Sequence, residues 1–121
     1  MDSYPEFIPG AGACIVSRNV LSGAGRARWM VRDPSLGPGD TGWRIFSHID
    51  TTEYLSDSNN MTVADFNQVC ALEPALIVIW DMPVGSDLQL VLDDRGRHIY
   101  DTPTGREIPR EEYYYPPHWR D

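Results

Sequence analysis

Residues 62–80, TVADFNQVCALEPALIVIW, predict the helix and the strand on which the fold depends. The first half carries apolar residues at helical spacing, namely Val63, Phe66, Val69 and Cys70. Because Thr62 is a residue type that caps helices and Pro74 is one that ends them, we expect one principal helix over residues 62–73. The second half, residues 75–80, is apolar throughout. Such a run is typical of a strand buried on both faces, so we expect a central strand there.

Apolar runs and alternating patterns predict shorter strands around this stretch, at residues 13–17, 27–32, 43–47, 88–92 and 98–100. We expect the first two to form a hairpin around a turn at residues 22–25, and the last two to form another around residues 93–96. Residues 50–60 are polar and predict an exposed loop. The expected fold class is α+β: a curved, mainly antiparallel sheet of five or six strands with the 62–73 helix packed on one face.

The 121 residues provide for one domain with one core. We expect an α+β domain over residues 1–101 and a tail over residues 102–121, rich in proline and aromatic residues, that lies over the domain or extends from it. Cys14 and Cys70, which are far apart, are expected to be reduced core thiols. The chain begins without a secretory signal pattern and has no apolar run of roughly 20 residues, so we expect a soluble, cytoplasmic protein.

The net charge of −8 is concentrated in the middle of the chain. Residues 50–101 hold ten acidic residues against two arginines, a local balance of −8. Nucleic-acid affinity comes largely from basic side chains that neutralise phosphates, so this charge argues against a nucleic-acid partner. It favours a cationic protein partner, which would be attracted to this segment; a surface that only maintains solubility is the alternative.

No strong catalytic or metal motif is present, and we expect no cofactor, no metal and no enzymatic activity. The three histidines are far apart in the sequence. Asp81 and Asp87 flank a Pro-Val-Gly turn and are close enough in sequence to share a proton or a cation. The commoner role of such acids is to accept hydrogen bonds from the amides of their own turn. A small enzyme, or a domain that binds a metal or small molecule with Asp81, Asp87 and His48, is therefore an alternative function.

Five blocks of sequence together resemble the immunity protein thirty-three-like family, first catalogued as a bacterial domain of unknown function: Gly12–Ser17, Trp29–Asp33, Asp40–Ser47, Glu53–Leu55 and Asp81–Ser86. The Gly-Trp-Arg-x-Phe-Ser pattern in the third block is the most specific. The resemblance implies a small α+β domain that neutralises a toxin of a bacterial polymorphic-toxin system. The chain departs from the family pattern after Ser86 and in the tail from residue 102, and variable edges and termini of this kind are where the specificity for a partner is set.

Under this resemblance, the hypothesis places the partner-binding surface on the 50–60 loop, the 81–87 turn and the tail: Asp50, Glu53, Tyr54, Asp57, Asp81, Asp87, Tyr114 and Trp119. The acidic charge fits a toxin whose active cleft is basic, such as a nuclease. Trp29, Trp43 and Trp80 are expected to be core residues instead, and packing of the tail aromatics on their own domain is an equal alternative. A general interaction module without a toxin partner is a third reading of the chain.

Overall fold

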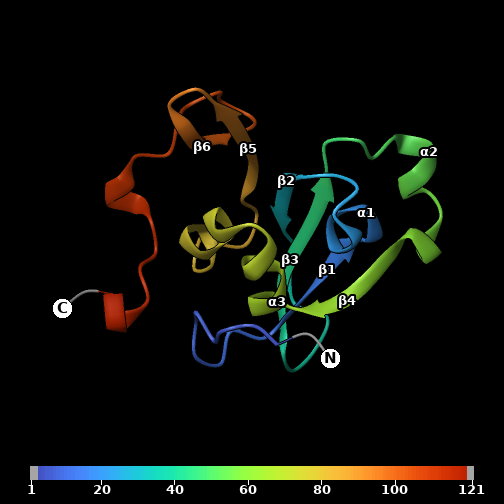
Figure 1. Ribbon diagram of the computed structural model, residues 1–121, viewed down its shortest axis with the longest axis horizontal. Coiled ribbons are helices and arrows are strands. Elements are labelled where there is room, and N and C mark those ends of the chain that lie inside the picture. The colour runs from blue at the N-terminus through green and yellow to red at the C-terminus, as the bar shows by residue number, and fades with distance from the viewer. Residues whose placement is uncertain (1–2, 120–121) are drawn as a thin grey trace.

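The computed structural model describes residues 3–119. Six strands form one sheet in the order β4-β1-β3-β2-β5-β6 (Figure 1). Their bounds are β1 Ala13–Ser17, β2 Ala27–Arg32, β3 Asp40–Ser47, β4 Met61–Asp65, β5 Asp87–Asp93 and β6 Gly96–Asp101. Neighbouring strands are antiparallel except β1 and β3, which run parallel. The predicted α+β class with a mainly antiparallel sheet of five or six strands is confirmed.

Short helices pack on the sheet or connect its strands. They are α1 Arg18–Ser22, α2 Thr52–Leu55 and α3 Phe66–Leu72, with the 3₁₀ helices η1 Ser58–Asn60, η2 Pro74–Ile79, η3 Arg110–Glu112 and η4 Pro117–Trp119. α3 and η2 contact each other and bury side chains of both helices in the core. None of the helices within residues 3–119 has the length and apolar character needed to cross a bilayer.

The predicted helix over residues 62–73 is wrong in its first part. Residues 61–65 form strand β4, which pairs antiparallel with β1, and the helix covers only residues 66–72. The N-cap is Asp65, whose side chain accepts a hydrogen bond from the backbone amide of Asn67, and not Thr62. A capping carboxylate here satisfies an amide that the first turn leaves unpaired. Phe66 and Val69 are fully buried, so this part of the helical pattern does mark the face that packs on the sheet.

The predicted central strand at residues 75–80 is also wrong, because this run forms η2. Pro74 stands at its first position, where the absent proline N–H costs nothing, and Glu73 caps it by accepting a hydrogen bond from the Ala75 amide at 3.1 Å. Leu76, Ile77 and η2's last residue, Ile79, are buried. A short apolar run that is buried all round has no period to separate a strand from a helix.

The first predicted hairpin is wrong because β3 lies between β1 and β2. Ser17 ends β1 and caps α1, since its hydroxyl accepts a hydrogen bond from the Asn19 amide. The chain therefore enters a helical turn where a tight strand-to-strand turn was expected. The second hairpin is confirmed, with β5 and β6 paired from Leu88–Asp101 to Asp93–Gly96.

The described part of the tail packs back on the rest of the chain. The Ile108 amide donates to the Ile99 carbonyl at 2.8 Å, and the Tyr114 amide donates to the Val78 carbonyl at 2.8 Å. Ile108 and Pro116 are buried. Residues 1, 2, 120 and 121, which belong to the predicted domain and tail, lie outside the described residues.

Both cysteines are buried and free, as predicted. Cys14 lies on β1 and Cys70 on α3. Burial raises the pKa of the Cys14 thiol to about 12, and burial also raises the pKa of Cys70. A thiol reacts as its thiolate, so these cysteines pack as small apolar side chains and are poor nucleophiles.

Candidate functional site

In the 50–60 segment, the predicted site residues divide into one structural and several exposed side chains. The Asp50 carboxylate accepts hydrogen bonds from the Ser47 amide, the Ser47 hydroxyl and the Asn19 side chain, each at 2.7 Å. Burial by itself raises the pKa of Asp50, but these hydrogen bonds outweigh it and hold the pKa below its ordinary value. Asp50 therefore fixes the end of β3, whereas Glu53 and Asp57 are exposed and available to a partner.

Tyr54 is half-buried beside these acids, and its carbonyl accepts a hydrogen bond from the Asn60 side chain at 2.8 Å. Asp57 caps η1 by accepting a hydrogen bond from the Asn59 amide at 2.9 Å. These bonds fix the segment after β3 as two helical turns, where an exposed loop was predicted.

The structure does not bring Asp81 and Asp87 together as a shared site. Asp81 is exposed and lines a hollow of about 310 Å³ with Asp101 and Glu112, whereas Asp87 begins β5 opposite Val31. Among the described residues, neither the Asp81 nor the Asp87 carboxylate accepts the predicted hydrogen bond from an amide of the turn. The Ser86 amide, for example, donates instead to the Pro83 carbonyl at 3.0 Å. The described residues contain no group of three or more His, Cys, Asp or Glu side chains arranged to hold a metal ion.

His48 lies far from Asp87. Its Nδ1 accepts a hydrogen bond from the Arg26 amide at 2.9 Å, just before β2, whereas Asp87 pairs with Val31 near the other end of that strand. Five residues of extended chain span about 16 Å. A joint catalytic role of His48 with Asp87 is therefore not supported by the geometry.

The tail aromatics lie at the opposite end of the molecule from α2, along its long axis (Figure 1). The Tyr114 ring packs on Trp80 with the ring centroids 5.0 Å apart, while Trp119 is exposed. The residues of the predicted interface therefore lie in separate regions of the molecule.

The core assignment of the tryptophans holds for Trp43, which is fully buried and donates from Nε1 to the Trp80 carbonyl at 3.0 Å. Trp80 is partly buried, and its indole donates to the Ala11 carbonyl at 3.2 Å. The assignment is wrong for Trp29, which is 38% exposed with the Arg28 guanidinium 4.8 Å above its ring. Trp29 points to a surface that the predicted site did not include.

The two faces of the sheet differ sharply in exposure. On the face beneath the helices, alternate residues of five strands are at most 2% exposed: Cys14, Val16, Met30, Ile45, Leu88 and Ile99. Strand register and alternation place the other residues on the opposite face. We call this opposite surface the open face, defined by its partly or largely exposed apolar members Ile15, Trp29, Val31, Phe46, Val63 and Val91.

Among the predicted site residues, register places Asp87 on the open face. The sequence signal that would have revealed this surface is the presence of apolar residues at both sets of alternating positions in β1 to β5. One set has to fill the core, and the other set then needs a cover. The register also places Arg44, Asp87 and Gln89 on this face, so exposed apolar side chains lie there beside charged and polar ones. Exposed apolar groups rimmed by polar residues are typical of a protein-interaction surface.

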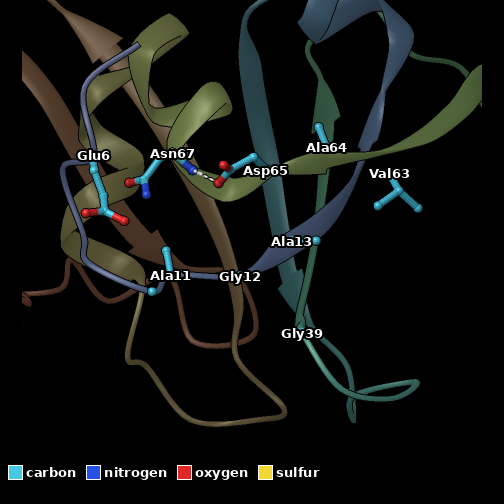
Figure 2. A pocket seen from close by; sticks show the side chains of 10 residues that line it. Glu6, Ala11, Gly12, Ala13, Gly39, Val63, Ala64, Asp65 and Asn67 are labelled. Atoms are coloured by element: carbon cyan, nitrogen blue, oxygen red, sulfur yellow. Dashed lines mark hydrogen bonds between the residues drawn. The ribbon is translucent and has the colours of Figure 1, made fainter. Parts of the chain in front are cut away.

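Two neighbouring hollows lie beside β4, and both are lined by Ala13, Gly39 and Val63. The larger, about 480 Å³, has Glu6, Asp65 and Asn67 along its wall (Figure 2). Its polar groups are partly occupied: the Tyr4 hydroxyl donates to Asp65 at 2.9 Å, and the Asn67 side chain bonds both backbone groups of Ile8 at 3.0 Å.

The smaller hollow has a volume of about 270 Å³ and a more apolar wall. Ile15 and Val63 come from the sheet, and Leu36 and Pro38 come from the loop between β2 and β3. Val63 is 70% exposed and Leu36 is 79% exposed, so apolar side chains project beside this hollow.

An ion pair holds the loop that carries Leu36. Arg44 is buried on the open face, and its Nη1 and Nη2 donate to the two carboxylate oxygens of Asp40, each at 3.0 Å. The same carboxylate accepts from the Leu36 amide at 2.8 Å and from the Gly42 amide at 3.0 Å. The hydrogen bond from Arg44 is the main cause that lowers the pKa of Asp40 well below its usual range. The loop is thus fixed by a charged group that stays ionised.

Comparison with known proteins agrees with the resemblance noted in the sequence. Residues 14–111 match the family model described as Immunity protein Imm33 domain, which covers all six strands except the first residue of β1. No curated protein and no solved structure matches the chain. Membership of an immunity family implies toxin neutralisation in polymorphic toxin systems. The chain belongs to the Imm33 immunity protein family.

Proposed function

We propose that this protein neutralises its cognate toxin by binding the toxin directly and stoichiometrically, without catalysis. The observation that carries this proposal is the open face, a sheet surface on which apolar side chains of five strands remain partly or largely exposed. Interfaces between proteins are centred on buried aromatic and arginine side chains. Trp29, with Arg28 stacked above it, supplies that combination near the middle of the sheet.

The open face is also held in place before any partner arrives. Arg28 donates from Nη2 to the Gln89 side chain at 2.8 Å and from Nη1 to the Leu90 carbonyl at 3.2 Å, which ties β2 to β5. Side chains that are already ordered lose less conformational entropy on binding. A preorganised surface is suited to the tight binding that toxin neutralisation demands.

The charge of the chain supports a basic toxin as the partner. Glu53 and Asp57 are exposed beyond the end of β3, Asp87 lies on the open face, and Asp81 is exposed beyond η2. Together with the net charge of −8, they attract a cationic protein and speed its association. A nuclease, which needs a basic cleft to bind phosphates, is the toxin class that this charge fits best.

Stoichiometry tests the proposal. The neighbouring genes are searched for a toxin domain, and the activity of the purified domain is measured against increasing amounts of the immunity protein. Direct binding predicts complete inhibition near a 1:1 ratio and a 1:1 complex on gel filtration. Neutralisation at a small fraction of the toxin concentration, without a stable complex, would instead indicate an enzymatic immunity protein and refute the proposal.

Trp29→Ala and Trp119→Ala locate the contact. Both side chains are exposed tryptophans, at 38% and 47%, so the two variants remove similar surfaces without opening a core. We expect Trp29→Ala to weaken the complex by about 2 kcal/mol and Trp119→Ala to leave it nearly unchanged. The reverse pattern would assign the interface to the tail, as the sequence hypothesis allowed.

A further inference from the structure

The two edges of the sheet differ in how they are covered. At β6, the tail adds hydrogen bonds: the Asp101 amide donates to the Arg106 carbonyl at 2.8 Å, and Tyr100 forms a bridge with Glu107. At β4, no described residue outside β1 pairs with the backbone of residues 62–64. β4 forms the outer border of the sheet in Figure 1. An uncovered edge strand presents unpaired amides and carbonyls that can pair with another extended chain.

The surface beside this edge offers places for two kinds of side chain. Val63, on β4, separates an apolar hollow, formed with Leu36 and Pro38, from the larger hollow that contains Glu6 and Asp65. In Figure 2, the Val63 side chain points away from Glu6 and Asp65. A strand added to β4 would meet both hollows, because both border the same residue.

The charge around the edge indicates which partner fits. Glu6 and Asp65 are exposed, and neither hollow is lined by an arginine or histidine among the described residues. The basic residue near the other end of β4, Arg18, donates to the Asn59 carbonyl at 2.6 Å. A second copy of this chain would bring like charges together at the edge, which opposes self-association. A cationic segment is favoured instead.

We propose that β4 is the docking edge for an extended segment of the toxin that carries both apolar and basic side chains. The segment pairs with the backbone of residues 62–64, places an apolar side chain in the hollow beside Leu36, and places a basic side chain next to Glu6 and Asp65. Main-chain pairing supplies affinity in such strand addition, and the side-chain hollows supply specificity. This inference rests on the proposed function and names the part of the surface that reads the toxin.

Val63→Arg tests the proposal, with Val84→Arg as its matched control. Both valines are exposed, at 70% and 56%, so either arginine is tolerated by the fold. Val84 lies in the turn before β5, and β5 is four strand positions from β4, or about 19 Å. We expect Val63→Arg to weaken toxin binding about tenfold or more, and Val84→Arg to change it less than about twofold. Equal effects of the two variants would overturn the proposal.

Glu6→Gln examines the basic contact, with Glu111→Gln in the tail as its control, because both glutamates are exposed. We expect Glu6→Gln to weaken toxin binding about threefold to tenfold in low salt and much less in high salt. High salt screens the attraction of the toxin to the wild-type protein, so the wild type and the variant then bind with similar affinity. No difference between the two variants at low salt would show that the larger hollow does not receive a basic side chain.

Hydrogen exchange of the wild-type chain with and without toxin gives an independent reading. We expect slower amide exchange in residues 61–65 of the complex, because a paired edge loses its contact with water. Protection confined to residues 87–101 or 113–119 would overturn the edge proposal while leaving direct binding intact. Failure of the wild-type protein to form any complex with the toxin would instead contradict the proposed function itself. A β4-dependent homodimer, dissociated by Val63→Arg, would assign the edge to a second copy and overturn the proposal.

Discussion

Replacing Asp40 by alanine removes the carboxylate that pairs with Arg44, and the structure allows the consequence to be worked out. The Arg44 side chain is 7% exposed and that of Asp40 is 18% exposed, so the pair lies largely out of water. Arg44 would keep the hydrogen bond from Nη1 to the Trp43 carbonyl at 3.1 Å. Its one remaining acidic partner among the described residues would be Asp33, whose carboxylate is 3.6 Å from Nε and 58% exposed. Removing one partner of a buried ion pair costs about 3–5 kcal/mol, because a charge is left without compensation.

We place the expected loss for Asp40→Ala near the lower limit, at about 3 kcal/mol, because Asp33 and entering water retain part of the compensation. Arg44→Met leaves an acid at the edge of the sheet that water can reach, so it should cost about 1–2 kcal/mol. The double variant should cost about as much as Asp40→Ala alone. The resulting coupling energy between the two side chains is then about 1–2 kcal/mol.

Urea unfolding at pH 7, followed by tryptophan fluorescence, measures these free energies, since Trp43 is fully buried next to Arg44. The pKa of Asp40 is lowered in the fold, so its contribution is complete above its ordinary value of 3.8 and is lost as the pH falls through the folded pKa. The Asp40→Ala variant should lack this part of the acid dependence. A coupling energy below about 0.5 kcal/mol would refute the reasoning that the pair fixes this part of the fold.

Three further predictions follow from the packing and the ion pairs. Gly42→Ala should destabilise the fold by about 3 kcal/mol or more in urea unfolding, because φ is +88° and the new Cβ would lie 2.0 Å from the Asp33 carbonyl oxygen. Phe66→Ala should cost about 3–5 kcal/mol in the same assay, because the ring is fully buried. Hydrogen bonds with Glu107 and Asp93 raise the pKa of His98 above 6.5. The contribution of protonated His98 to the stability of the fold is therefore complete below pH 6.5 and is lost as the pH rises through the folded pKa, which an NMR titration measures.

Each of these has a control in the chain. Gly37→Ala adds a methyl group with no atom within 4 Å, and should be neutral within about 0.5 kcal/mol. Leu72→Ala removes a half-exposed side chain from the same helix as Phe66, and a similar cost for both would show that the helix does not dock through Phe66. A His98 pKa at or below 6.5, or one unchanged by Glu107→Gln, would contradict the assigned ion pairs.

The sequence was a good guide wherever a pattern had one physical reading. Residues 88–92 alternate, and a glycine stands at position 96 with φ +112°, so the β5–β6 hairpin was predictable from its own residues. The two thiols were predictable as core residues because neither has a partner at a metal or redox spacing. These features depend on neighbours within a few residues.

Patterns with two readings were decided by the rest of the fold. Val63 fits the helical period of residues 66–70, yet it lies on β4 because β1 offers a partner strand and Asp65 begins the helix behind it. The run 75–79 fits a buried strand or a buried helix, and the proline at its start together with the packing against α3 gives the helix. Local propensity is a weak prior that tertiary contacts override.

By itself, the sequence determined that this chain is an acidic α+β domain with one core, and the blocks of its strands indicated its family. Only the tertiary structure decided the strand order, and with it the surface. β3 lies between β1 and β2, and the strand register places Trp29, Phe46 and Val63 on the same face of the sheet although long segments separate them in the chain. Alternation along a strand predicts which side chains share a face of the sheet. It does not predict which of the two faces is buried, because that depends on how the strands pair and on where the helices pack.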